Sequence, residues 1–240
     1  MAIAGTGTIA NVLTIVLGSG LGSLLGQRLP KRTNESLLQA IGLVVIVVGV
    51  QMGLTAQTAF QAVVVLLSMA IGVGVGEAID IERLLMRVGH ALEMSAKQYL
   101  GSSPIAKAFV TSSIVFLVGP MAILGSIQDG LGNPSLLLIK SGLDGVASIA
   151  FTASLGIGTL FSALPILLYQ GSLTLLAAQV ETFMTAAVVD ALTAVGGLLV
   201  LGVGLNLLDI TRLRLGNFLP ALLVAAAIAA WTPLWSLDFS

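Results

Sequence analysis

Apolar segments about 20 residues long follow one another along nearly the whole chain. A bilayer core about 30 Å thick is crossed by about 20 helical residues, so each segment is long enough to span it. Only 9% of the 240 residues are charged, against about 25% in ordinary soluble domains. We therefore predict an all-α, polytopic membrane helix bundle, with the lipid bilayer as a partner and no nucleic-acid partner.

The same length rule predicts about eight spans in a single transmembrane domain that covers residues 1–240. We interpret the first span as a retained helix, since its basic residues follow the apolar run and do not precede it as in a signal peptide. A re-entrant hairpin at 108–155 beside six full spans is the alternative. The predicted spans lie near residues 7–26, 37–54, 58–77, 108–126, 135–155, 158–178, 187–207 and 217–235.

Lysine and arginine outside the spans occur after the first, third and seventh predicted spans. Eight crossings place these three loops on one side of the membrane, as expected for cytoplasmic loops, and both termini on the other side. Apolar residues at helical spacing among charged ones predict an amphipathic surface helix at 80–100, acting as a linker or as a partner-binding element. The basic loop residues are Arg28, Lys31, Arg32, Arg83, Arg87, Lys97, Lys107, Arg212 and Arg214.

Two glycine patterns predict how the helices pack. Gly18, Gly22 and Gly26 recur every four residues, the spacing at which helix backbones approach closely in lipid. The segment QAIGLVVIVVGVQMGL (39–54) also aligns with AVGGLLVLGVGLNLLD (194–209) at an offset of 155 residues. This alignment suggests inverted three-helix repeats at 7–78 and 160–235, which flank the surface helix and a central helical hairpin at 108–155.

The stretch GPMAILGSIQDGLGNP interrupts the apolar sequence with two proline breaks and a short polar patch formed by Ser126, Gln128 and Asp129. Proline inside a span removes a backbone hydrogen bond and breaks or kinks the helix. One interpretation is an outer loop with Asp129 at the membrane interface. The other is a discontinuous helix whose broken ends and polar side chains bind a cation or a polar solute.

Lys140 and Asp144 lie inside the next apolar run, and Asp144 is expected about 14 Å into the bilayer at 1.5 Å per residue. Residues four apart share one helix face, so the two charges can neutralise each other. Small neighbours such as Ser141 leave room for a backbone, water or a ligand. Either the pair is purely structural, or it belongs to a solute path, as intramembrane charges often do.

Three amide side chains complete the predicted site: Gln170, which lies in the same predicted span as Pro165, and Gln51 with Asn206, which are equivalent in the repeat alignment. The absence of cysteine and the single histidine, His90, leave no thiolate or histidine cluster for a metal site. We expect no enzyme activity and no cofactor other than a coupling proton or sodium ion.

These features predict an ion- or proton-coupled secondary transporter of a small polar solute. An ion channel and a structural or regulatory membrane protein are the alternatives, since glycine breaks suit a channel and polar residues also specify helix pairing. The glycine-lined helix faces are consistent with a homodimer.

Four segments resemble the bacterial YqgA/YdfK-like membrane proteins, a family labelled as a domain of unknown function. The resemblance implies a protein of the bacterial cytoplasmic (inner) membrane with seven or eight spans, and it supplies no substrate or mechanism. The segments are GPMAILGSIQDGL, LLIKSGLDGVASIAF, LGIGTLFSALPILLYQGSLTLLA and ALTAVGGLLVLGVGLNLL.

Overall fold

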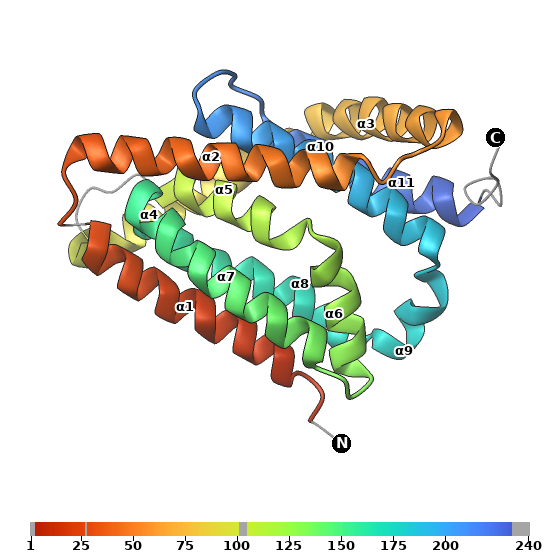
Figure 1. The fold of residues 1–240 in the computed structure, drawn as a ribbon, viewed down its shortest axis with the longest axis horizontal. Coiled ribbons are helices and arrows are strands. Elements are labelled where there is room, and N and C mark those ends of the chain that lie inside the picture. Colours follow the sequence, from red (N-terminus) through yellow and green to blue (C-terminus); the bar gives the residue numbers. More distant parts are fainter. Residues whose placement is uncertain (1–2, 27, 101–104, 232–240) are drawn as a thin grey trace. The chain divides into compact units, whose positions relative to one another are not determined.

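The computed structural model of the protein describes residues 3–26, 28–100 and 105–231, and these ranges form helices and connecting turns without a strand (Figure 1). The predicted all-α architecture is confirmed. The α-helices are α1 (Thr6–Gly26), α2 (Lys31–Gly53), α3 (Ala59–Ile79), α4 (Ile81–Leu100), α5 (Ile105–Leu117), α6 (Pro120–Gly130), α7 (Ser135–Leu155), α8 (Ala163–Leu175), α9 (Ala177–Val180), α10 (Ala186–Leu207) and α11 (Pro220–Trp231), and the short 3₁₀ helices are η1 (Ile157–Ser162), η2 (Glu181–Phe183) and η3 (Leu215–Phe218).

Six helical segments are long and apolar enough to cross a membrane, or seven if α5 and α6 together form one bent span. This is fewer than the eight predicted spans. When α5 and α6 are counted as one span, the difference lies at 217–235, where Leu215–Trp231 is a shorter apolar segment and residues 232–235 fall outside the described ranges. The six segments are Thr6–Gly26, Arg32–Gly53, Ala59–Ile79, Ser135–Leu155, Ile157–Leu175 and Ala186–Leu207.

The chain divides into two compact units. Unit 1 draws on Met1–Ile41, Leu84–Leu117 and Met121–Ala178. Unit 2 draws on Gly42–Arg83, Val118–Pro120 and Gln179–Ser240.

Unit 1 is built on α1 and α7, which lie side by side and run in the same direction (Figure 1). The predicted glycine face of α1 makes this contact. A Cβ added at Gly18 would lie 2.1 Å from Ser148 Oγ, and one at Gly26 would lie 2.7 Å from the Ala153 carbonyl oxygen. Only glycine allows the two backbones to approach this closely, which is how small residues bring helices together in lipid.

Helices α8 and α5–α6 complete unit 1. Helix α8 packs against α1 in the opposite direction, since Thr8 contacts Thr174 and Asn11 contacts Gln170. Helix α5 begins beside η1, where a Cβ at Gly158 would lie 2.2 Å from the Ile105 carbonyl oxygen. Helix α6 ends beside the first turn of α1. The α5–α6 pair therefore runs from one end of α1 to the other and bends by 65° on the way.

Unit 2 repeats the close glycine packing in an antiparallel pair formed by α10 and the part of α2 from Gly42 onward. A Cβ at Gly49 would lie 2.4 Å from the Leu201 backbone nitrogen, and one at Gly204 would lie 2.9 Å from the Gly42 carbonyl oxygen. Helices α3 and α11 also pack closely, because Gly72 lies against the backbone of Ala221. These contacts fix the helix axes without any charged side chain.

Helix α4 covers most of the surface helix predicted at 80–100, and the side chains of residues 96–100, including Lys97, lie outside the described part of the chain. The turn before it ends α3 through Asp80, which adopts the left-handed conformation with φ of 57°. Within unit 2, Glu82 accepts a hydrogen bond from the Gly216 backbone N–H at 2.7 Å, and Asn217 accepts one from Glu82 N–H at the same distance. These bonds tie the α3–α4 corner to the loop before α11.

Candidate functional site

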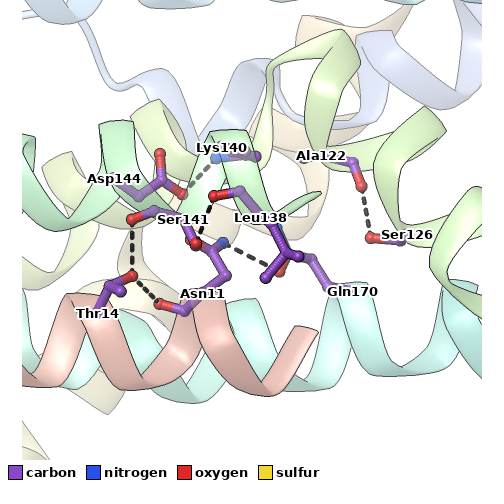
Figure 2. A network of polar contacts seen from close by, with 9 residues as sticks. All are labelled: Asn11, Thr14, Ala122, Ser126, Leu138, Lys140, Ser141, Asp144 and Gln170. Atoms are coloured by element: carbon purple, nitrogen blue, oxygen red, sulfur yellow. Dashed lines mark hydrogen bonds and ion pairs between the residues drawn. The ribbon is translucent and has the colours of Figure 1, made fainter. Parts of the chain in front are cut away.

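The predicted ion pair is formed within α7. The Lys140 ammonium group donates a hydrogen bond to the Asp144 carboxylate one helical turn later (Figure 2). Lys140 is 6% exposed and Asp144 is 7% exposed. Since α7 is long and apolar enough to cross a membrane, two opposite charges are held inside a candidate span, where unpaired charges would be costly.

Small residues on the same face of α7 let α1 approach the pair. A Cβ at Gly145 would lie 3.0 Å from the Thr14 Cβ, and the Thr14 hydroxyl donates to the Ser141 carbonyl oxygen at 2.8 Å (Figure 2). The Ser141 hydroxyl donates to the Leu138 carbonyl oxygen at 2.6 Å. Ser141 thus holds α1 against the turn that carries the charges, and its hydroxyl is already engaged.

A buried pair of amides from two other helices adjoins the Asp144 carboxylate through Asn11. Asn11 of α1 donates to the Gln170 side-chain oxygen of α8 at 3.1 Å, and both residues are 0% exposed (Figure 2). The Asn11 amide also lies next to the Asp144 carboxylate, to which it can donate its second N–H. Three helices that meet in unit 1 therefore each contribute polar side chains to one cluster.

Asp129, near the end of α6, contacts the beginning of α1. Its carboxylate, which is 0% exposed, accepts hydrogen bonds from the backbone N–H groups of Gly7 and Thr8, at 3.0 and 2.9 Å, and from the Thr8 hydroxyl at 3.1 Å. The first N–H groups of a helix have no partner within the helix and favour a carboxylate. Asp129 therefore caps α1 and joins it to the end of α6.

Ser126 belongs to the same contact region through its backbone. Its hydroxyl donates to the Ala122 carbonyl oxygen at 2.5 Å within α6 (Figure 2), while its own carbonyl oxygen accepts a hydrogen bond from Thr174 at 3.1 Å. Thr174 also contacts the Thr8 hydroxyl at 3.0 Å. Polar contacts therefore extend along α1 and α8 from the cap at Asp129 to the amides Asn11 and Gln170.

The remaining predicted residues, Gln128, Gln51 and Asn206, have other surroundings within their own units. Gln128 is exposed on α6. Gln51 and Asn206 belong to unit 2, where Gln51 is exposed and Asn206 holds a loop: its side chain accepts from Leu213 N–H at 2.9 Å and donates to the Leu213 carbonyl oxygen at 2.8 Å. Asn206 thus stabilises a loop. Of the residues predicted for the site, Lys140, Ser141, Asp144 and Gln170 lie around Asn11, and Ser126 and Asp129 join them through Thr174 and Thr8.

An aromatic residue borders the charged end of the cluster. Phe116, near the end of α5, places its ring centroid 6.0 Å from the Lys140 Nζ, within the range of a cation–π contact. The same ring packs edge-on against Phe151, with centroids 5.7 Å apart. Phe116 precedes the break between α5 and α6 by two residues, so a change in the bend would move the ring that faces Lys140.

Sequence reasoning missed Asn11, Thr8 and Thr174 as members of the cluster. A signal existed for Asn11, which is a lone amide inside an apolar span. Threonine carries no such signal, because it is common in membrane helices and satisfies itself by bonding its own backbone.

The arrangement offers one ion pair and several neutral hydrogen-bonding groups inside candidate spans. The described residues contain no group of three or more histidine, cysteine, aspartate or glutamate side chains that could hold a metal ion. Fold and site together define a polytopic helical membrane protein with a buried, charge-balanced polar cluster.

The particular family follows from comparison with known sequences. The chain belongs to the family described as "Protein of unknown function (DUF554)", which matches residues 6–230. It is 32% identical over 232 residues to the "Uncharacterized protein YqgA" of Escherichia coli (strain K12), with 94% of this chain and 97% of the relative covered. It is also 29% identical over 225 residues to the "Uncharacterized membrane protein YdfK" of Bacillus subtilis (strain 168), with 92% of this chain and 94% of the relative covered. No solved structure matches the chain. The family resemblance seen in the sequence is confirmed.

Proposed function

We propose that this protein is a secondary transporter that couples a small polar solute to a proton or a cation. The single observation that carries the proposal is the buried Lys140–Asp144 pair inside a candidate span, adjoined by the amides of Asn11 and Gln170 from two other helices. Ionisable groups at membrane depth commonly line solute or proton paths.

In this mechanism Asp144 takes up the coupling proton or cation, and Lys140 is its counter-charge in the unloaded state. Neutralising one member of a buried pair leaves the other unpaired, at a cost of about 3–5 kcal/mol. Uptake at Asp144 therefore requires a compensating contact for Lys140, which an anionic or strongly polar solute supplies. The energetic link between the two charges is what couples the two fluxes.

Packing in unit 2 supports the two-fold repeat that alternating access uses. The repeat alignment pairs Gly42 with Gly197 and Gly49 with Gly204. A Cβ at Gly42 would lie 3.4 Å from the Gly204 carbonyl oxygen, and one at Gly49 would lie 2.8 Å from that of Gly197. The alignment therefore converts the Gly42–Gly204 contact into the Gly197–Gly49 contact, as expected for two segments related by a two-fold axis. We propose that the repeats at 7–78 and 160–235 rock against each other.

The bend of 65° between α5 and α6 supports a discontinuous span. Gly119 and Pro120 lie at the break, and a Cβ at Gly119 would meet no atom within 4 Å. Helix ends at membrane depth expose backbone groups that bind solutes and ions in transporters. In our proposal the α5–α6 break changes its bend during the cycle and thereby moves Phe116 relative to Lys140.

We place the protein in the bacterial cytoplasmic membrane with both termini outside, because the basic loops then all face the cytoplasm. Its partners in this proposal are lipid, the solute with its coupling ion, and a second copy of the chain in a homodimer. It is not an enzyme and uses no cofactor beyond the coupling proton or sodium ion.

The test uses purified protein in liposomes that carry an imposed proton or sodium gradient. The probe is a deproteinised bacterial metabolite extract, and mass spectrometry measures what accumulates inside. We expect at least one polar solute to accumulate above its external concentration with the wild-type protein, and no accumulation with Asp144→Asn. Asp209→Asn is the matched control, since this carboxylate is exposed and asparagine also tolerates its left-handed conformation, with φ of 55°.

Equal accumulation by Asp144→Asn and wild type would remove Asp144 from the mechanism. Gradient-independent, non-saturating flux would favour a channel. If no solute in the extract moves in any gradient while the protein is folded, the polar cluster is a structural element and the transporter proposal fails.

A further inference from the structure

Asn11 and Gln170 retain unused hydrogen-bonding atoms at full burial. Asn11 Oδ1 and Gln170 Nε2 have no hydrogen-bond partner, and both side chains are 0% exposed. More than 90% of buried polar groups in proteins are satisfied, so two such atoms on contacting side chains need an explanation. Both atoms are therefore available to bond to a further molecule.

The Asp144 carboxylate sets the orientation of both amides. Amide oxygen and nitrogen atoms are assigned from their hydrogen-bond network. Because an ionised carboxylate only accepts hydrogen bonds, the Asn11 nitrogen faces Asp144 and Gln170, which leaves the Asn11 oxygen as an unused acceptor and the Gln170 nitrogen as an unused donor. A molecule that bonds to both atoms must therefore supply one donor and one acceptor.

The neighbouring ion pair limits the charge of that molecule. Lys140 and Asp144 already neutralise each other at 6% and 7% exposure. A ligand with net charge would leave an uncompensated charge in the buried cluster, which is strongly unfavourable. Ligands that enter beside the intact pair are therefore neutral.

We propose that Asn11 and Gln170 form a binding site for a small, uncharged group that carries one hydrogen-bond donor and one acceptor. Carboxamides and undissociated carboxylic acids share this chemistry. This inference rests on the proposed transport function in one respect: the bound group is taken to be part of the transported solute. An undissociated acid is equivalent to a carboxylate with its coupling proton, whereas a carboxamide brings no proton of its own and depends on the ion taken up at Asp144.

Saturation-transfer NMR on the full-length protein in detergent tests the site, with acetamide and acetate as probes at pH 5.5 and pH 8. Acetone, which has an acceptor and no donor, is the matched probe. We expect a transfer signal for acetamide at both pH values and a weaker one for acetone. If the acid form binds, the acetate signal falls as the pH rises; if it stays absent at both values, the site takes carboxamides.

Two variants assign the signal to the amide pair. Asn11→Leu and Gln170→Leu remove the hydrogen-bonding atoms at similar volume, and each should weaken probe binding about fivefold, as for the loss of one hydrogen bond. Gln128→Leu is the control, because it removes an exposed amide from α6. If Asn11→Leu does not fold, Gln170→Leu alone decides the result.

Absence of any probe signal in folded wild-type protein, or equal signals in wild type and Gln170→Leu, would show that the amides hold water only and would overturn the inference. The two proposals fail separately. Probe binding without gradient-driven uptake leaves the amide site standing and removes transport. Uptake that requires Asp144 without probe binding removes the amide site alone.

Discussion

The α1–α7 pair of unit 1 and the α2–α10 pair of unit 2 use the same packing device and differ in what lies beside it. In both, glycine brings one helix against the backbone of the other, at Gly18 in unit 1 and at Gly49 in unit 2. The α2–α10 contact is made by glycine and aliphatic residues such as Ile46 and Leu201. The α1–α7 contact adds a buried ion pair on α7.

Close helix packing in this protein therefore does not require charged side chains. Van der Waals contact between small residues is sufficient to associate helices in lipid, as unit 2 illustrates. Replacing a buried ion pair by apolar residues of similar volume is often neutral or stabilising. The Lys140–Asp144 pair therefore needs a reason other than holding α7 in place, and the transport function that we propose would supply one.

The largest effect is expected from separating the two charges. Lys140→Met or Asp144→Leu alone leaves a buried unpaired charge and should lower the free energy of unfolding by about 3–5 kcal/mol. The double variant Lys140→Met/Asp144→Leu should recover most of this loss and still lack gradient-driven uptake. Denaturant-induced unfolding in mixed micelles measures the stabilities.

If the double variant kept full uptake, the ion pair would not be needed for transport, and the charge on α7 would no longer distinguish unit 1 from unit 2 in function. If each single variant lowered the free energy of unfolding by less than about 1 kcal/mol, the two charges would interact as weakly as those of an exposed salt bridge.

A smaller effect is expected from crowding the glycine contacts, and it should be similar in both units. Gly18→Leu and Gly49→Leu should each lower the free energy of unfolding by about 1–3 kcal/mol, because the added side chain meets backbone or Ser148 atoms. Gly20→Leu is the control on the same helix as Gly18, since its Cβ would meet nothing within 4 Å. A loss in only one of the two units would contradict a shared packing device.

The smallest effect on stability is expected at the cap of α1. Asp129→Ala should lower the free energy of unfolding by about 0.5–2 kcal/mol, the usual range for losing an N-cap. Gln128→Ala, one residue earlier and exposed, should change it by less than about 0.5 kcal/mol. If Asp129→Ala instead abolishes uptake at unchanged stability, Asp129 belongs to the solute path, as the sequence first suggested.

Sequence reasoning succeeded where the information is local. The lengths of the apolar runs predicted most helices, and the four-residue spacing of Lys140 and Asp144 predicted their contact, because both depend only on helical geometry. Contacts between distant segments could not be predicted in this way. Asp129 caps a helix that begins more than 120 residues earlier, and Gln170 meets Asn11, which is 159 residues away.

The physical reason is that a helix apolar on all sides does not indicate which face meets which neighbour. The repeat alignment therefore suggested Gln51 as a site residue without showing that its side chain is exposed in unit 2. The same alignment did pick out the glycines through which α2 and α10 touch, because at this contact the small residues themselves form the helix surfaces that meet.

The proposed transport requires that water and solute reach the Lys140–Asp144 pair. Thiol accessibility can measure this, because the chain has no cysteine of its own. Ser141→Cys and Ser148→Cys make the same substitution two turns apart on α7, one beside the ion pair and one against Gly18. In intact membranes we predict that a membrane-impermeant maleimide labels position 141 and that imposing an ion gradient changes the rate, while position 148 stays unlabelled. Equal protection of both positions under every gradient would mean that the pair is sealed in dry protein, and the transport account would be contradicted.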